Sequence, residues 1–351
     1  MIGRGQNLAR ALGGSHDDGV NLDDAAKGLP GPAEFDPILA ASPDDLMARE
    51  SALCWFALIA PDEAQAKHHT REMVRWHPDS PSIYAMNMTL FDREPAFREE
   101  IESSLEALQA SGRGSHSSLA TLASVVGHRA VAPRFETEVD RRRWLQYHQL
   151  PDDYAIEQQA DEARAQRAAG YFRESIAYAR DAGDSFAVGL HTMQLIDLLI
   201  GLGQREEAAT TAAEALAAGD RAPIPDLQLT YGGLLVDLGR YEEARRAFDA
   251  AIEDDGKRFQ PCGHLPARAR LGLGTVALVH DDDRERAVEH LLAAASVPPC
   301  MHTQTQGIGI RLARKLAACG ERDAVRRCCE VVLRDVCPGD GPSRELLESL
   351  G

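Results

Sequence analysis

Two short loops carry a cysteine and a histidine one residue apart. Cys262 precedes His264 in the run PCGH, and Cys300 precedes His302 in the run PCMH. Thiolate sulfur and imidazole nitrogen both ligate zinc, so these four residues are candidate metal ligands if the two loops lie side by side. The spacing within each pair is tighter than in the common zinc motifs. We therefore expect loops without a metal, and we expect no cofactor.

Four other cysteines gather near the C-terminus: Cys319, Cys328, Cys329 and Cys337. Redox sensing and metal binding are open to them, but free cysteine also packs as a small hydrophobe. We favour packing, because the residues around Cys329 have the apolar spacing of a buried helix face. The total of seven cysteines is odd and suits reduced thiols better than a disulfide framework, which predicts a cytoplasmic protein.

The remaining chemistry-bearing residues do not form a recognisable catalytic motif. His69 and Glu72 are one helical turn apart, but the two-histidine pattern of a metalloprotease helix is absent, so we expect surface histidines. No nucleophile elbow and no Cys/His dyad at a known spacing occurs. Whether the protein is an enzyme stays open, and the sequence favours a non-catalytic protein.

Composition narrows the class of partner and of fold. The 351 residues include 38 Lys and Arg against 55 Asp and Glu, a formal charge of −17. Nucleic-acid binding needs clustered cations, so we do not expect a nucleic-acid partner. No stretch approaches twenty apolar residues, so we expect no membrane partner. Aromatic residues make up only 5% of the chain, which favours helices over sheets.

One pattern recurs along the second half of the chain. Gly170, Gly203 and Gly239 each separate two apolar-periodic runs, and they lie 33 and 36 residues apart. A glycine between two such runs is typical of the turn in a helical hairpin. We therefore predict a series of hairpins, each ending its first helix at one of these glycines.

The clearest copy runs from Leu227 to Asp254. Its small and large side chains alternate at helical spacing, in the order Gly232, Gly239, Tyr241, Ala244, Phe248 and Ala251. This run resembles the tetratricopeptide repeat, a helix–turn–helix unit of roughly 34 residues. A further copy follows in which Asp282 replaces the turn glycine, and another surrounds Gly320.

Weaker copies precede these. We pair Asp45–Ala60 with Asp62–Trp76, Ser82–Phe91 with Pro95–Ala110, and Ser117–Val126 with Arg134–His148. The resemblance, to a bacterial type of tetratricopeptide-like helical repeat protein, then covers about 45–336 and implies an all-α, right-handed superhelical solenoid of about eight antiparallel hairpins.

The predicted organisation has four parts. Residues 1–44 form a flexible acidic arm, 45–150 degenerate hairpins, 151–340 regular repeats, and 341–351 a capping segment.

The resemblance also implies a binding surface, because the first helices of such hairpins line a concave groove that holds peptides. Carried onto the matching positions, the groove residues are Leu190, Met193, Asp197, Asp226, Leu229, Gly233, Asp237, Val276, Ile310 and Arg314. This set is apolar and mildly acidic, so it fits a protein or peptide segment with apolar and basic groups.

The resulting hypothesis is a scaffold or adaptor protein. Two alternatives remain: an enzyme or enzyme subunit with a site inside the superhelix, and a peptide-sensing regulator that acts on another protein. The sequence leaves the oligomeric state open.

Overall fold

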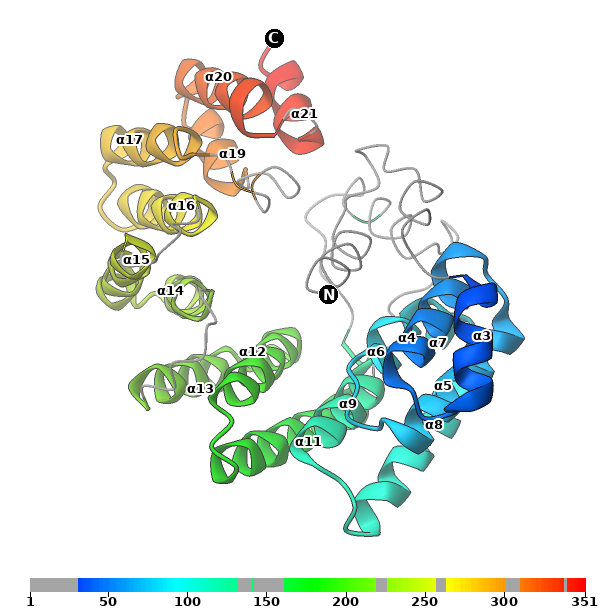
Figure 1. Ribbon diagram of the computed structural model, residues 1–351. Coiled ribbons are helices and arrows are strands. Elements are labelled where there is room, and N and C mark those ends of the chain that lie inside the picture. Colours follow the sequence, from blue (N-terminus) through cyan, green and yellow to red (C-terminus); the bar gives the residue numbers. More distant parts are fainter. Residues whose placement is uncertain are drawn as a thin grey trace. The chain divides into compact units, whose positions relative to one another are not determined.

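The computed structural model describes residues 31–131, 141, 161–218, 226–256, 263–298, 300, 303, 310–337 and 340–351 (Figure 1). Throughout these residues the chain forms helices and turns and no strand, so the prediction of an all-α fold is confirmed. The described residues divide into two compact units. Unit 1 comprises those from 31 to 204, and unit 2 those from 205 to 351.

Unit 1 contains short and irregular helices followed by two long ones. They are α3 (Pro32–Ala41), α4 (Leu46–Cys54), the π-helix η2 (Trp55–Ile59), α5 (Glu63–Trp76), α6 (Ser82–Ala85), α7 (Met88–Arg93), α8 (Pro95–Ala110), α9 (His116–Gly127), α11 (Glu162–Asp181) and α12 (Ser185–Gly201). Helices that follow one another pack together: α4 on α5, α8 on α9, α9 on α11, and α11 on α12.

The first two predicted hairpins of unit 1 are present. Helix α4 continues into η2 and turns back as α5, as predicted for Asp45–Ala60 with Asp62–Trp76. In the second hairpin, the segment predicted as one helix over Ser82–Phe91 is divided into α6 and α7, and α8 follows from Pro95. Proline suits this first helical position because its missing amide hydrogen has no helical acceptor there.

The third hairpin differs from the prediction. The partner of α9 is α11, whereas the predicted partner, Arg134–His148, lies outside the described residues except for position 141.

Helix α11 also runs without a break through Gly170, where we predicted a turn. The turn is at Gly183, whose φ of 70° needs a residue without a Cβ atom. Sequence spacing could not reveal this, because a single glycine costs a long helix only about 1 kcal/mol.

The predicted arm is also partly helical. Within residues 31–44, α3 packs on α4 through Phe35, which is buried in a small cluster with Ala48 and Ala52. The rest of the arm, residues 1–30, lies outside the described residues.

Unit 2 is a regular succession of hairpins. Its helices are α13 (Arg205–Ala217), α14 (Leu227–Asp237), α15 (Tyr241–Gly256), α16 (His264–Val279), α17 (Arg284–Ala295), α19 (Arg311–Ala318), α20 (Arg322–Val331), the π-helix η4 (Val332–Val336) and α21 (Gly341–Ser349). Each of α13 to α17 packs on the next, α17 packs on α19 and α20, and α21 packs on α20. The predicted helical-repeat fold is confirmed in this succession.

The predicted small and large positions meet in the core of unit 2. A Cβ atom built on Gly232 would lie 2.6 Å from the Phe248 ring, and one built on Gly272 would lie 2.3 Å from it. The ring therefore contacts the backbones of two helices, α14 and α16, directly. The turns also follow the prediction: Gly239 and Gly320 have φ of 73° and 98°, and Asp282 takes the turn position at φ 53°.

No helix in the described part of the chain is both long enough and apolar enough to cross a lipid bilayer.

Candidate functional site

Three of the predicted groove residues lie on one face of α12 in unit 1. Leu190 is 42% exposed, Met193 is half-buried and Asp197 is exposed. Phe186, which the sequence analysis did not single out, is 59% exposed one turn before Leu190. The spacings of four, three and four residues put these side chains in a single row along the helix. We call Phe186, Leu190, Met193 and Asp197 the α12 stripe.

The opposite face of α12 holds the helix in place. Val188, Leu195, Ile196 and Leu199 are buried on it, and α12 packs on α11. The helix begins where the Asp184 side chain accepts a hydrogen bond of 2.9 Å from the backbone nitrogen of Ala187. The stripe is therefore carried by a capped helix and not by a loop.

Asp197 gives the stripe a negative end. No ion pair joins its carboxylate to another described residue, and burial by surrounding atoms raises its pKa. More than a third of the surface of this residue is exposed to solvent. Phe186 could have been predicted from the sequence, because positions 186, 190, 193 and 197 have the spacing of one helix face.

In unit 2 the structure removes three residues from the predicted groove. Leu229, Val276 and Ile310 are buried, with 5%, 0% and 9% of their surfaces exposed. The reason is that the first helix of each hairpin also packs on the first helix of the next, as α14 does on α16 and α16 on α19. Only a narrow strip of each such helix remains open, and these residues lie outside it.

The other predicted groove residues of unit 2 remain at least partly exposed, but the two acids are already paired. Asp226 binds Arg268 through a contact of 2.7 Å, and Asp237 lies 3.3 Å from Arg205. Gly233 is exposed and Arg314 is half-buried. Each of the two acids predicted for this part of the groove is therefore already neutralised by an arginine.

One member of each Cys/His loop lies in the described part of unit 2, and these two meet. The imidazole of His264, the first residue of α16, interacts with the thiol of Cys300 and with the Asp226 carboxylate, whose Oδ1 is 3.6 Å from Nε2. Interaction with Asp226, and to a smaller extent with Cys300, raises the pKa of His264. Cys262 and His302 lie outside the described residues. Across the described residues, no three His, Cys, Asp or Glu side chains are placed to hold a metal ion.

The C-terminal cysteines fit the packing hypothesis. Cys328, Cys329 and Cys337 are buried, and Cys319 is exposed. Burial raises the pKa of Cys328 to about 12 and that of Cys329 to about 11, so both are protonated at neutral pH.

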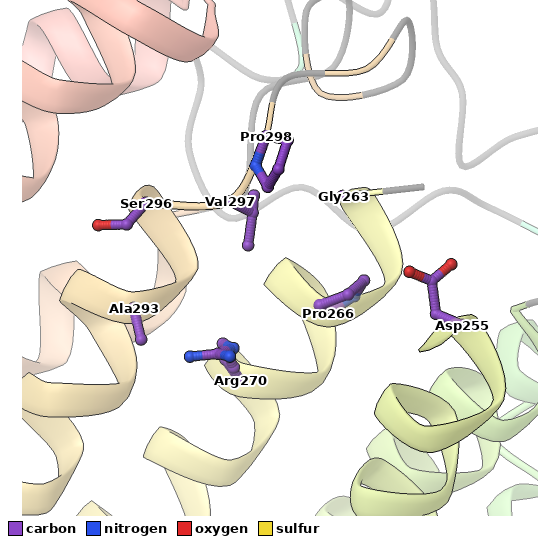
Figure 2. A pocket seen from close by; sticks show the side chains of 8 residues that line it. All are labelled: Asp255, Gly263, Pro266, Arg270, Ala293, Ser296, Val297 and Pro298. Carbon is purple, nitrogen blue, oxygen red and sulfur yellow. The ribbon is translucent and has the colours of Figure 1, made fainter. Parts of the chain in front are cut away.

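A pocket of about 440 Å³ lies among α15, α16 and α17 (Figure 2). Asp255 and Arg270 give it opposite charges, and Pro266, Val297 and Pro298 give it apolar walls. The Nε atom of Arg270 is buried and has no hydrogen-bond partner in the described structure. Sequence reasoning singled out none of these lining residues, because they come from three helices with no common motif.

Unit 1 holds a buried cluster that the sequence analysis also missed. Asp92 accepts hydrogen bonds from Arg129, at 3.0 Å, and pairs with His128 Nε2 at 2.9 Å. Burial alone would raise the pKa of Asp92, but the hydrogen bonds with His128 and Arg129 outweigh it and lower the pKa. The Asp92 and His128 side chains are 0% and 1% exposed. A substrate cannot reach them, so this cluster stabilises the fold.

His69 is a correction to the sequence analysis, which expected a surface histidine. It is buried, stacks on Phe56 at a centroid distance of 5.5 Å, and lies 3.1 Å from the Arg49 guanidinium through Nδ1. Since an Arg always donates, Nδ1 accepts this bond and the ring is neutral. The geometry around His69 therefore does not provide a metal site.

The chain is similar to solved helical-repeat structures. A tetratricopeptide repeat protein from Parabacteroides merdae ATCC 43184 is 13% identical with a TM-score of 0.42, over 90% of this chain and 98% of that chain. The human IFIT1 dimer with m7Gppp-AAAA is 13% identical with a TM-score of 0.46, over 94% and 67%. The P58(IPK) TPR domain is 12% identical with a TM-score of 0.24, over 99% and 97%.

No protein-family model and no curated protein matches the chain. At these TM-scores, the ligands of those structures do not indicate what this chain binds. The helical-repeat fold of this chain rests on its own hairpins, in which Phe248 lies against Gly232 and Gly272.

Proposed function

We propose that this protein binds a segment of another protein along the α12 stripe. The observation that carries the proposal is a row of apolar side chains that ends at Asp197: Phe186 and Leu190 are exposed, and Met193 is half-buried. Large apolar side chains left open to water in a row typically mark an interaction surface. Elsewhere on α11 and α12 the exposed large apolar residue is Tyr178, which stands alone.

The chemistry of the stripe defines the partner. The row from Phe186 to Asp197 covers twelve residues, or about 16 Å of helix. It fits a segment with two or three apolar side chains on one face, followed by Lys or Arg to meet the Asp197 carboxylate. The net charge of −17 supports a basic segment over a polyanion such as nucleic acid. A cytoplasmic location, expected from the cysteine content, belongs to the same proposal.

The test is a selection of randomised dodecapeptides on the purified full chain, followed by affinity measurement of the enriched peptides. Leu190→Glu puts a charge in the middle of the row, and we expect it to weaken binding at least tenfold, about 1.4 kcal/mol. The matched control is Tyr178→Glu, which places the same charge at an exposed aromatic residue on α11, away from the stripe.

Two results would contradict the proposal. One is that no peptide is enriched above an unrelated acidic helical protein used as the bait. The other is that the enriched peptides bind Leu190→Glu as tightly as they bind the unchanged protein.

A further inference from the structure

Long side chains join helices α8 and α11 of unit 1, which both pack on α9. The hydroxyl of Tyr171 on α11 donates a hydrogen bond of 2.9 Å to the Glu106 carboxylate on α8. One turn earlier on each helix, Arg167 forms an ion pair with Glu102. The partners are 65 residues apart in both pairs, so the two helices run in the same direction and their side chains meet in a regular row.

The next position of this row brings two arginines together, Arg98 of α8 and Arg164 of α11. They precede the Glu102–Arg167 pair by four and three residues, which is one turn of each helix. Arg164 donates a hydrogen bond of 2.8 Å from Nη2 to the carbonyl oxygen of Val126 near the end of α9. Burial and then the nearby charge of Arg98 lower the pKa of Arg164, as expected for two neighbouring cations. The row therefore ends in a pair of like charges.

The Arg98 side chain is buried without a partner. Only 7% of the residue's surface is exposed, and its Nε atom is enclosed and makes no hydrogen bond. No hydrogen bond or ion pair joins this side chain to any residue that the structure describes. Of the two carboxylates near Arg164, Glu102 is held by Arg167, and Asp161 accepts a hydrogen bond of 3.0 Å from the Arg164 backbone nitrogen.

The chemistry of arginine makes this burial unfavourable. A guanidinium keeps its proton at every pH at which proteins fold, so Arg98 cannot become neutral as a buried lysine or histidine can. A buried charge is tolerated when an opposite charge and hydrogen-bond acceptors compensate it. The described residues around Arg98 supply neither, which leaves the compensation to a bound anion.

We propose that Arg98 and Arg164 bind the phosphate group of a small ligand between α8 and α11. This inference is independent of the α12 stripe, with which it shares no residue. Each guanidinium presents its N–H groups in a planar fork that matches two phosphate oxygens. A phosphate monoester carries a charge of about −2 at neutral pH and so balances both arginines, whereas a carboxylate balances one. The net charge of −17 disfavours a polyanion, so we assign the phosphate to a small ligand.

The experiment measures thermal unfolding of the full chain with inorganic phosphate as the probe. Tryptophan fluorescence reports on unit 1, where all three tryptophans lie. Sodium phosphate is compared with sodium chloride and sodium acetate at the same ionic strength. We expect phosphate at about 10 mM to raise the Tm by about 2 °C or more relative to either salt, which corresponds to a Kd of about 1 mM or tighter.

The variant Arg98→Met removes the charge and keeps an unbranched side chain that suits a buried position. Its phosphate shift should fall to the small general effect that phosphate has on any folded protein. In phosphate-free buffer the variant should be at least as stable as the unchanged protein, because an unpaired buried charge is gone. Arg98→Lys keeps the charge without the fork, so it should bind phosphate about threefold more weakly or worse.

The matched control is Arg71→Met on α5, which removes an exposed arginine that Glu100 already holds at 2.6 Å. This variant should keep the full phosphate shift. The proposal is overturned if phosphate raises the Tm no more than chloride or acetate does, or if Arg98→Met keeps the phosphate shift of the unchanged protein. A lower Tm of Arg98→Met in phosphate-free buffer would also overturn it, because Arg98 would then be paired within the chain.

Discussion

Unit 1 and unit 2 fill their interiors with different chemistry. The core of unit 2 is built from alanine, leucine and valine around Phe248, whose ring rests on glycine backbone. Most of the buried polar side chains in the described structure lie in unit 1. Among them are the pairs Arg49 with His69, Thr70 with Asn87, Asp92 with His128, and Ser175 with His191. Arg129 also donates to Asp92.

This difference predicts which changes in pH or in sequence destabilise each unit. Small apolar side chains that interlock need only the right volume, so their contribution does not depend on pH. A buried polar pair stabilises the fold only while both partners are present and correctly protonated. We therefore expect unit 1 to be the more sensitive to acid and to the loss of a single charge, and unit 2 the more sensitive to changes in side-chain volume.

The largest expected effect is the loss of Asp92 from unit 1. Asp92→Ala leaves Arg129 and His128 buried without their carboxylate, which should cost about 3–5 kcal/mol of unfolding free energy. Urea unfolding followed by tryptophan fluorescence measures this, because all three tryptophans of the sequence lie between residues 20 and 204.

The matched control for this change is in unit 2. Asp237→Ala removes the carboxylate of the exposed pair with Arg205 and should change the unfolding free energy, followed by circular dichroism because unit 2 has no tryptophan, by less than about 1 kcal/mol. Equal losses for the two variants would contradict the contrast between the units.

Acid should destabilise unit 1 through its buried histidines. Burial lowers the pKa of His69 and that of His191 to about 4, below the ordinary 6.5. The unfolded chain therefore binds these protons at a higher pH than the folded chain does. The resulting stability is fully present above pH 6.5 and is lost as the pH falls from about 6.5 to 4, up to about 3 kcal/mol per histidine at pH 4.

Urea unfolding at pH 7, 5 and 4 checks this prediction. His69→Gln should flatten the pH dependence of the tryptophan-detected transition, whereas the same change at the exposed His280 of unit 2 should not. His264 of unit 2 has the opposite sign: its raised pKa contributes stability at low pH that is lost as the pH rises through the folded-state pKa. An unchanged slope in His69→Gln would contradict the assignment of acid sensitivity to this buried ring.

The smallest expected effects come from two adjacent glycines of α14. Gly232→Ala places a Cβ atom against the Phe248 ring, and overpacking should cost about 1–3 kcal/mol. Gly233→Ala meets nothing within 4 Å, so the better helix propensity of alanine should stabilise by about 1 kcal/mol. Thermal unfolding followed by circular dichroism measures both. Effects of the same sign would mean that the Phe248 contact does not define this core.

The same contrast explains what sequence reasoning could and could not reach. The helical hairpins of unit 2 could be predicted because Gly232, Phe248 and the turn glycines follow one repeated spacing. In unit 1, the turn at Gly183 and the pairing of α9 with α11 could not be predicted, because Gly170 fits a continuous helix as well as it fits a turn.

The candidate site was predictable only in part. Leu190, Met193 and Asp197 lie on an open helix face, while Leu229, Val276 and Ile310 are buried. Periodicity identifies a face of a helix, but it does not tell which neighbouring helix covers that face. The sequence analysis considered that the two Cys/His loops could lie side by side, which would bring His264 near Cys300. It did not predict that Asp226 pairs with Arg268.

The most direct test of the account reverses the charge at the end of the α12 stripe. Peptides are selected in parallel on the unchanged protein and on Asp197→Lys, with the apolar part of the stripe intact. The account predicts that both selections keep the same apolar side chains and that the Lys or Arg at the end of the consensus is replaced by Asp or Glu. One consensus shared by both proteins, with the same charge at that position, would contradict binding along α12.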